Sequence, residues 1–264
     1  MAERGTHLNF SAGVASVSVA FVLVCLKLWA LGSTQALSVA ASLTDSALDM
    51  TMSLFGLVAI IYAARPADED HAFGHTSVED LAALGQSIFI MISSVVIGWA
   101  AVHRLLSDAP QKLAAEGRGI IVMVVSILLT ICLVLWQRRV TRQTGSKVVA
   151  ADSLHYMSDL LPSLGAIAAL WMSRAFGIGQ IDSIVALAAA CMLAFGAWRI
   201  GKGAWDSLMD RRADPALIGD IAKLAGNWPG VHGFHDLKTR TAGSRVFVNL
   251  HIELDGDQSL REAH

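Results

Sequence analysis

Long apolar runs separated by short polar segments dominate the chain as far as about residue 200. Six of them reach the roughly 20 residues that an α-helix needs to cross the hydrocarbon core of a bilayer. They are Ser11 to Leu31, Leu37 to Ala64, Leu81 to Leu106, Gly119 to Trp136, Val148 to Met172 and Ile178 to Ile200. The pattern predicts a mostly α membrane protein with six transmembrane helices. The first is expected to be retained, because no small-residue cleavage site follows it.

The pattern changes near Trp205, where the sequence takes on the character of a soluble segment. The expected elements are a helix from Asp214-Pro215 through Leu224 and strands over Phe234 to Thr241 and Arg245 to Leu254. We therefore divide the chain into a transmembrane domain, residues 1–204, and a small cytoplasmic α+β domain, residues 205–264. Two strands make a poor core alone, so this domain is expected to be cut short or to depend on a partner copy.

Composition and charge support insertion in a membrane. Of the 264 residues, 54% are hydrophobic and 16% are charged, against roughly a quarter charged in soluble domains. The net charge of −2 gives no basic excess, so no nucleic-acid partner is expected. Four basic residues lie between the fourth and fifth predicted spans: Arg138, Arg139, Arg142 and Lys147. That loop should be cytoplasmic, and an even number of spans then places both termini in the cytoplasm.

Four ionisable residues lie inside the predicted spans, in two pairs of helical i, i+4 spacing. Asp45 and Asp49 are in the second span, and His155 and Asp159 are in the fifth. Such residues cost several kcal/mol in lipid and usually have a function. Three carboxylates and one imidazole supply the four ligands of a tetrahedral zinc site. The alternatives are that they hydrogen-bond one another to hold the bundle, or that they line a proton path without metal.

Two further groups of residues outside the spans carry metal-binding side chains. Asp68, His71 and His75 follow the second span and could close on one ion, although acidic and histidine-containing loops are often simply solvated. His235 and His251 lie on the two predicted strands, with Asp236 and His264 also available. A histidine pair of this kind is more often structural than liganding.

Two charged residues near the membrane interior are expected to lie at an interface. Lys27 in the first span and Asp182 in the sixth could join a pathway, but we favour extension toward the membrane surface.

Taken together, these residues resemble the cation diffusion facilitator family, in particular its bacterial zinc and iron efflux branch. The resemblance covers nearly the whole chain. It rests on the segment Ser42 to Asp49, on Asp68-x-x-His71-x-Phe73-Gly74-His75, on His155-x-x-x-Asp159, and on Trp228-Pro229-Gly230-Val231 followed by His235-Asp236-Leu237.

The resemblance implies a role for each cluster. Asp45, Asp49, His155 and Asp159 would form the transport site, and Asp68, His71 and His75 a second site at the membrane surface. His235, His251 and His264 would belong to a metal site in a ferredoxin-like cytoplasmic domain that dimerises. The first, second, fourth and fifth spans would form a compact bundle, with the third and sixth outside it.

Two departures from the family pattern affect the dimer. The chain stops at His264, before the helix and strand that bring further ligands in the family, so the tail site is expected to be incomplete. Ser77 stands where relatives carry a lysine that pairs with an acid beyond the sixth span, here Asp210. That ion pair is therefore not expected.

The function implied is efflux of a divalent metal, zinc first, with cadmium, iron and manganese as alternatives. The expected mechanism is metal and proton antiport by alternating access in the bacterial inner membrane, with His155 and Asp49 as the proton-coupling residues. No enzymatic activity and no cofactor are expected; the metal is substrate and structural or regulatory ion, and the partners are lipid, protons and a second copy. The rival reading is a metal-sensing or assembly protein of the same fold that does not transport.

Overall fold

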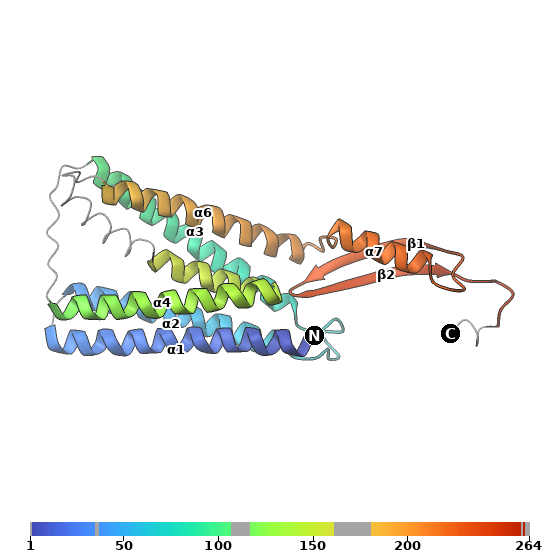
Figure 1. Ribbon diagram of the computed structural model, residues 1–264, viewed down its shortest axis with the longest axis horizontal. Helices are drawn as coiled ribbons and strands as arrows, with labels where there is room; N and C mark the ends of the chain where they lie inside the picture. The colour runs from blue at the N-terminus through green and yellow to red at the C-terminus, as the bar shows by residue number, and fades with distance from the viewer. Residues whose placement is uncertain (1, 35–36, 107–116, 161–180, 260, 262–264) are drawn as a thin grey trace.

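The computed structural model describes residues 2–34, 37–106, 117–160, 181–259 and 261. The helices in this part of the chain are α1 (Ala2–Thr34), α2 (Leu37–Ala63), α3 (Ser77–Leu106), α4 (Gly117–Thr144), α6 (Ile181–Leu208) and α7 (Pro215–Gly226). Two strands, β1 (Gly233–Ala242) and β2 (Arg245–Glu253), follow α7. Residues 147–160 are also helical, and we refer to them as the fifth helix. The long helices lie side by side, and α7 with the β-hairpin projects beyond one end of them (Figure 1).

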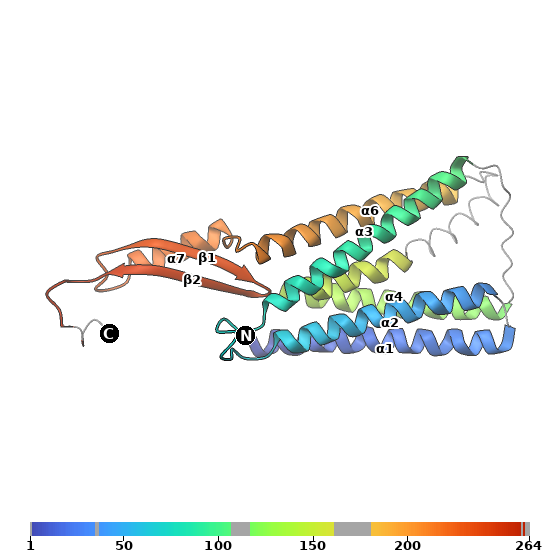
Figure 2. The same ribbon diagram turned by 180° about the vertical axis from the view of Figure 1, so that it is seen from behind.

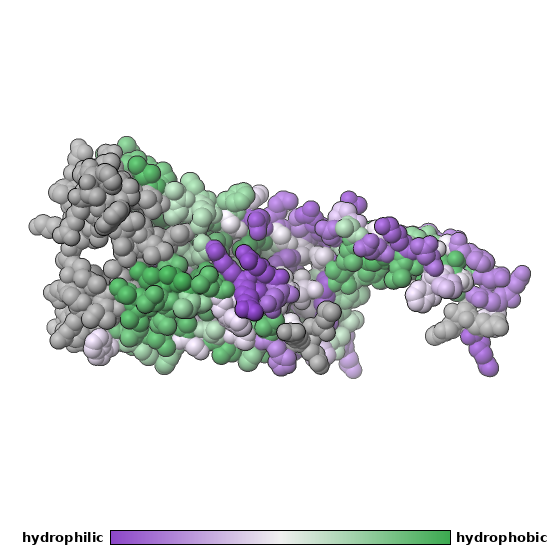
Figure 3. All heavy atoms as spheres, in the orientation of Figure 1, coloured by the Kyte–Doolittle hydropathy of each residue, from purple (hydrophilic) through white to green (hydrophobic). Residues whose placement is uncertain are grey.

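Four helices in the described part of the chain are long and apolar enough to cross a membrane. Their apolar stretches are Gly5–Trp29, Ser46–Ala63, Ser77–His103 and Val124–Thr144, which match the first four predicted spans. The fifth predicted span is described only as far as residue 160, and the sixth falls on the helix α6. Hydrophobic side chains cover the helices away from the hairpin, and hydrophilic ones gather around the helix ends nearest to it (Figure 3). These are the features of an integral membrane protein.

The helices extend beyond the apolar runs at the end nearest the hairpin. Helix α3 begins at Ser77 rather than at Leu81, and two acids, Glu79 and Asp80, lie in its first turn, where the helix dipole favours negative charge. Helix α4 continues to Thr144, so the expected basic loop after Trp136 is wrong in its extent. The connection to the fifth helix is only two residues long, because polar side chains can extend a helix once it leaves the apolar layer.

The long helices form two groups. Helix α1 packs on α2 and α4, whereas α3 packs mainly on α6. The pair α3 and α6 diverges from the other helices toward the end far from the hairpin, as Figures 1 and 2 show from opposite sides. Near the hairpin, small and branched apolar side chains from α1, α2, α3, α4 and the fifth helix share one core: Ala12, Ala59, Ile60, Ala82, Val140, Val148 and Val149. The expected bundle of the first, second, fourth and fifth helices therefore includes part of α3 at this end, whereas farther from the hairpin α3 lies with α6.

A buried polar cluster joins the helix ends to the hairpin. Lys147, at the start of the fifth helix, donates to Asp80 Oδ1 at 2.7 Å and to the hydroxyl of Ser207 on α6. Asp80 Oδ2 accepts a hydrogen bond from the backbone N–H of Gly243 in the hairpin turn, at 2.6 Å. Ser207 in turn contacts the hydroxyl of Thr241 at 3.1 Å. These five residues, which we call the polar junction, connect α3, the fifth helix, α6 and the turn between the strands.

The small domain after α6 has the predicted helix and two antiparallel strands. Asp214 caps α7 by accepting from the N–H of Ala216 at 2.8 Å. The strands pair from Gly233 opposite Glu253 to Ala242 opposite Arg245, with an irregularity between residues 235 and 238. The apolar side chains of β2 are poorly covered: Val246, Val248 and Ile252 are 40%, 37% and 51% exposed. Burial by α7 alone is insufficient, because one short helix cannot cover a nine-residue strand.

A tight contact at the hairpin turn gives a stability prediction. Gly243 has a φ of +57°, and a Cβ atom there would lie 2.6 Å from the carbonyl oxygen of Thr76. Gly243→Ala should therefore destabilise the docked hairpin by about 1–3 kcal/mol. The measurement is the temperature at which an added protease cleaves the hairpin, which should be lower in this variant than in the parent chain. Gly219→Ala on α7, where a Cβ meets no atom within 4 Å, should cleave like the parent chain or later. Equal cleavage temperatures for the two variants would contradict the contact.

Candidate metal site

Two acids and a histidine meet deep between α2 and the fifth helix. Asp49 on α2 and His155 and Asp159 on the fifth helix offer ligand atoms that all lie within 4.8 Å of one another. His155 Nε2 is 3.1 Å from Asp49 Oδ1, and the two side chains are 6% and 14% exposed. Asp159 is exposed, so the cluster is open on its side. We call these three residues the deep cluster.

The structure brings together three of the four residues predicted for this site. Asp45 lies on α2 one turn before Asp49, but its side chain falls outside the described part of the structure. Its place beside the deep cluster therefore stays a prediction.

Tyr156 fixes the orientation of the fifth helix. Its side chain is buried, and its hydroxyl lies 2.8 Å from Ser53 Oγ on α2 and donates to the carbonyl oxygen of Ser16 on α1 at 3.3 Å. Ser16 also donates to Ser53 at 2.9 Å. On the other side, the ring of Phe89 on α3 meets the imidazole of His155 edge to face, with 5.7 Å between centroids. These contacts direct His155 toward α2.

The prediction that Lys27 extends toward the membrane surface is wrong. Its ammonium group donates to Ser46 Oγ on α2 at 2.6 Å, and Ser46 is buried three residues before Asp49. A hydroxyl partner and nearby acids are within reach of the side chain, so the charge stays inside the bundle. The side chain of Asp182, the other residue expected at an interface, lies outside the described part of the structure.

Asp152, a buried acid next to the deep cluster, is not among the residues predicted from the sequence. It lies on the fifth helix three residues before His155 and is 5% exposed. Gln137 on α4 donates to its Oδ2 at 2.6 Å. The signal was available in the sequence, since Asp152 and His155 have i, i+3 spacing within an apolar run. It adds a further polar group in the bundle without belonging to the deep cluster.

Asp68, His71 and His75 form a second cluster in the loop between α2 and α3, which we call the loop cluster. Their ligand atoms also lie within 4.8 Å of one another. Asp68 contacts His71 Nδ1 at 3.1 Å and His75 Nε2 at 3.3 Å through its two oxygens. The backbone N–H of His71 donates to the Asp68 carboxylate and holds its pKa below the usual value. Asp68 therefore stays ionised, as a metal ligand must be.

The loop that carries this second cluster packs on the hairpin. The rings of Phe73 and Phe247 meet edge to face at 5.5 Å, and the guanidinium of Arg240 lies 4.4 Å from the centroid of Phe73. Arg240 also pairs with Asp210 at 3.2 Å. Asp210, for which no lysine partner is available at Ser77, thus has an arginine partner within its own chain.

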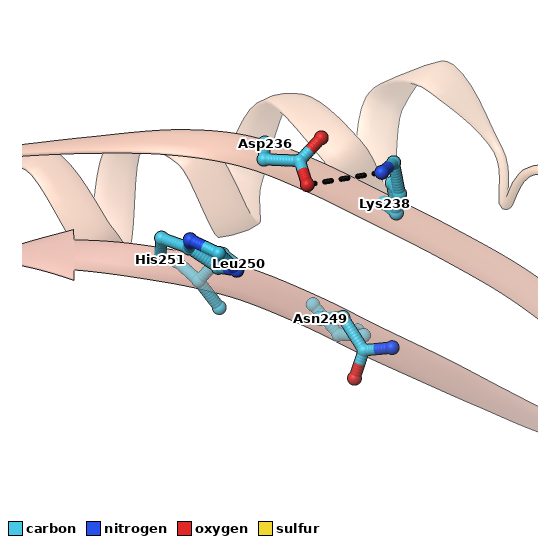
Figure 4. A pocket seen from close by; sticks show the side chains of 6 residues that line it. Asp236, Lys238, Asn249, Leu250 and His251 are labelled. Carbon is cyan, nitrogen blue, oxygen red and sulfur yellow. Dashed lines mark hydrogen bonds and ion pairs between the residues drawn. The ribbon is translucent and has the colours of Figure 1, made fainter.

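The hairpin brings two of the three predicted tail histidines together. His235 and His251 are register partners with ring centroids 5.1 Å apart, and His235 Nδ1 lies 3.0 Å from Glu253 Oε1. His264 lies outside the described residues. Beside them is a shallow surface pocket lined by Asp236, Lys238, Asn249, Leu250 and His251 (Figure 4). Asp236 is paired there with Lys238 at 2.9 Å, which lowers its pKa.

The two clusters of three residues have the donors that a divalent transition metal uses. Each combines imidazole nitrogen with carboxylate oxygen, a set that suits zinc and also accepts iron or manganese. His155 and Asp49 of the deep cluster are 6% and 14% exposed, whereas Asp68 and His71 in the loop are 53% and 52% exposed. The geometry therefore offers one largely buried position and one surface position for a cation.

Comparison with known proteins shows two family models that match this chain. The model of the cation efflux transmembrane domain matches residues 13–209, and that of the cation efflux protein cytoplasmic domain matches residues 213–264. The cation-efflux pump FieF of Shewanella oneidensis is 43% identical over 253 residues, covering 96% of this chain and 84% of the relative. FieF of Serratia proteamaculans is 39% identical over 264 residues, covering 100% and 87%.

These matches confirm the resemblance drawn from the sequence motifs. The matched transmembrane model covers most of the chain and spans α2 and the fifth helix, which carry the deep cluster. The chain belongs to the cation efflux family of integral membrane proteins.

Proposed function

We propose that this protein exports a divalent transition metal, zinc first, across a bacterial inner membrane in exchange for protons. The observation that carries the proposal is the deep cluster, in which Asp49, His155 and Asp159 converge from two helices of the membrane part. Membership of the cation efflux family and similarity to the cation-efflux pumps FieF support export of a cation.

The composition of the deep cluster supports both the metal and the exchange. Two carboxylates offset the charge of a divalent ion and reduce the penalty for removing it from water. Metal binding requires neutral imidazole and ionised carboxylates, so metal and protons compete for the same lone pairs. Acidification therefore protonates the ligands, weakens metal binding and favours release on the acidic side of the membrane. Alternating access would present the same ligands to each side in turn.

The remaining architecture belongs to the same proposal. Six spans with both termini in the cytoplasm would place the loop cluster and the hairpin in the cytoplasm. The cytoplasmic domain match at residues 213–264 and the uncovered apolar face of β2 support a ferredoxin-like domain that forms a homodimer. His235 and His251, with Glu253 beside them, would bind a structural or regulatory metal ion there.

Replacement of Asp49 tests the transport site. Asp49→Asn removes one charged ligand at nearly constant volume. Mutation of a residue that only hydrogen-bonds to a metal ligand lowers metal affinity roughly 10- to 100-fold, and loss of a ligand itself should lower zinc affinity further. The measurement is uptake of radioactive zinc into proteoliposomes with an imposed proton gradient. Asp220→Asn, the same change at an exposed position of α7, is the control and should transport normally. Undiminished flux in Asp49→Asn would refute the assignment, and absence of flux in the parent chain would favour the sensing or assembly reading.

Replacement of His155 by aspartate tests proton coupling. The variant keeps an anionic ligand in place of the imidazole, so it should still bind a divalent ion, with a different pH dependence and a shift toward harder ions such as manganese. The measurement is zinc and manganese affinity between about pH 5.5 and 8, with the protons released per ion counted. Equal proton release and equal pH dependence in both proteins would assign the exchange to the aspartates alone.

The loop cluster should matter less for transport than the deep cluster. His71→Ala combined with His75→Ala removes both imidazoles that face Asp68, so each chain should bind one zinc ion fewer in equilibrium dialysis. Zinc flux should remain measurable, because the deep cluster is untouched. Complete loss of flux with an intact fold would mean that the essential site lies in the loop.

A further inference from the structure

A groove runs between α3 and α6. Its volume is about 640 Å³. It is lined mainly by apolar side chains, among them Ile88, Met91, Ile92, Trp198 and Trp205, with Lys202 and Asp206 also in the lining. Lys202 and Asp206 lie near the end of α6 that meets the polar junction. The groove therefore has a charged end at the cytoplasmic helix ends and an apolar remainder.

The groove lies within the part of the molecule that faces lipid. On α3 it extends from Leu84 to Ile92, which is about 12 Å of helix and falls inside the span Ser77–His103. Ile88, Ile92 and Trp198 are 54%, 59% and 63% exposed. Small residues create the hollow: a Cβ atom at Gly201 would lie 2.6 Å from Ser87 Oγ, so the two helix backbones approach closely and leave no side chain to fill the space above them.

The charged end has an excess of one positive charge. Lys202 Nζ lies 3.5 Å from Asp206 Oδ2, and the guanidinium of Arg211 pairs with the same oxygen. Two cations thus share one carboxylate. Trp205, beside them, is 57% exposed, and tryptophan is favoured at the level of lipid headgroups.

We propose that this groove binds one anionic phospholipid. Its acyl chain lies along Ile88 and Ile92, and its phosphate group lies at Lys202 and Arg211. The charge excess favours an anionic headgroup over a zwitterionic one, and the apolar lining of the groove suits the acyl chain.

Charge also favours a lipid over a second copy of the protein as the molecule that covers the groove. In a twofold contact centred on the groove, the same surface of each copy faces its mate. The positive ends of the two grooves would then oppose one another without a compensating acid, which disfavours the contact. A lipid phosphate supplies the missing negative charge.

Native mass spectrometry of the full-length chain tests the proposal, with phosphatidylglycerol and phosphatidylcholine that carry identical acyl chains. The parent chain should retain one phosphatidylglycerol with about fivefold preference, the value expected for one cation near an anionic headgroup. Lys202→Gln should abolish the preference. Arg142→Gln removes an exposed cation in the last turn of α4, away from the groove, and should behave like the parent. Equal retention of both lipids by the parent chain would overturn the proposal.

Filling the groove tests its apolar part. Ile88→Trp should reduce retention of both lipids, because the larger ring occupies the space of the acyl chain. If this variant instead changes the ratio of dimer to monomer and binds lipid normally, the groove is a contact between copies. A second measurement leaves the groove unaltered: phosphatidylglycerol with brominated acyl chains should quench the tryptophan fluorescence of the parent chain. The saturable part of the quenching should disappear in Trp198→Phe with Trp205→Phe, and its persistence would also overturn the proposal.

Discussion

The ion pair between Lys147 and Asp80 holds the rest of the structure in register. The carboxylate of Asp80 is 1% exposed, and its two oxygens bond to Lys147 and to the backbone of Gly243. A buried charge without its partner typically costs 3–5 kcal/mol, so the start of the fifth helix cannot leave α3 cheaply. Through Ser207 the same lysine reaches α6. His155 lies two turns further along the same helix, whose start is held by this ion pair and whose later part is held by the hydrogen bonds of Tyr156.

The deep cluster differs from this ion pair, since it gathers two carboxylates beside one imidazole. Their ligand atoms lie within 4.8 Å of one another, and Lys27 on α1 donates to Ser46, which lies on α2 close to Asp49. Like charges held this close in an enclosed space are unfavourable in the absence of a cation or protons. The contacts that stabilise the helices carrying these residues lie elsewhere, in the small-residue core near the hairpin and in the polar junction. The residues that hold the helices together are thus different from the residues that could bind a cation.

Much of this could be predicted from the sequence, because membrane spans and their ionisable exceptions are strong signals. The pairing of Asp49 with His155 followed from i, i+4 spacing in two apolar runs, and α7 and the hairpin followed from cap, turn and alternation patterns. The helix ends did not follow, since Glu79 and Asp80 precede the apolar run, and the contacts of Asp80 with Lys147 and Gly243 become visible only in the structure. Lys27 was misplaced for the same reason: a hydropathy pattern contains no information on which hydroxyl of another helix is within reach. Asp152 could have been found, because its spacing to His155 was visible.

The division of the helices into two groups has a consequence for motion. The three residues of the deep cluster come from α2 and the fifth helix, and none comes from α3 or α6. The pair α3 and α6 meets this cluster through Phe89, whose ring touches His155 without a polar bond. A tilt of that pair would slide an aromatic surface past the imidazole and leave the distances among the three donor groups as they are. Because Lys147 bonds the start of the fifth helix to Asp80 and Ser207, such a tilt would turn about the polar junction, and the deep cluster would be uncovered from the end far from the hairpin.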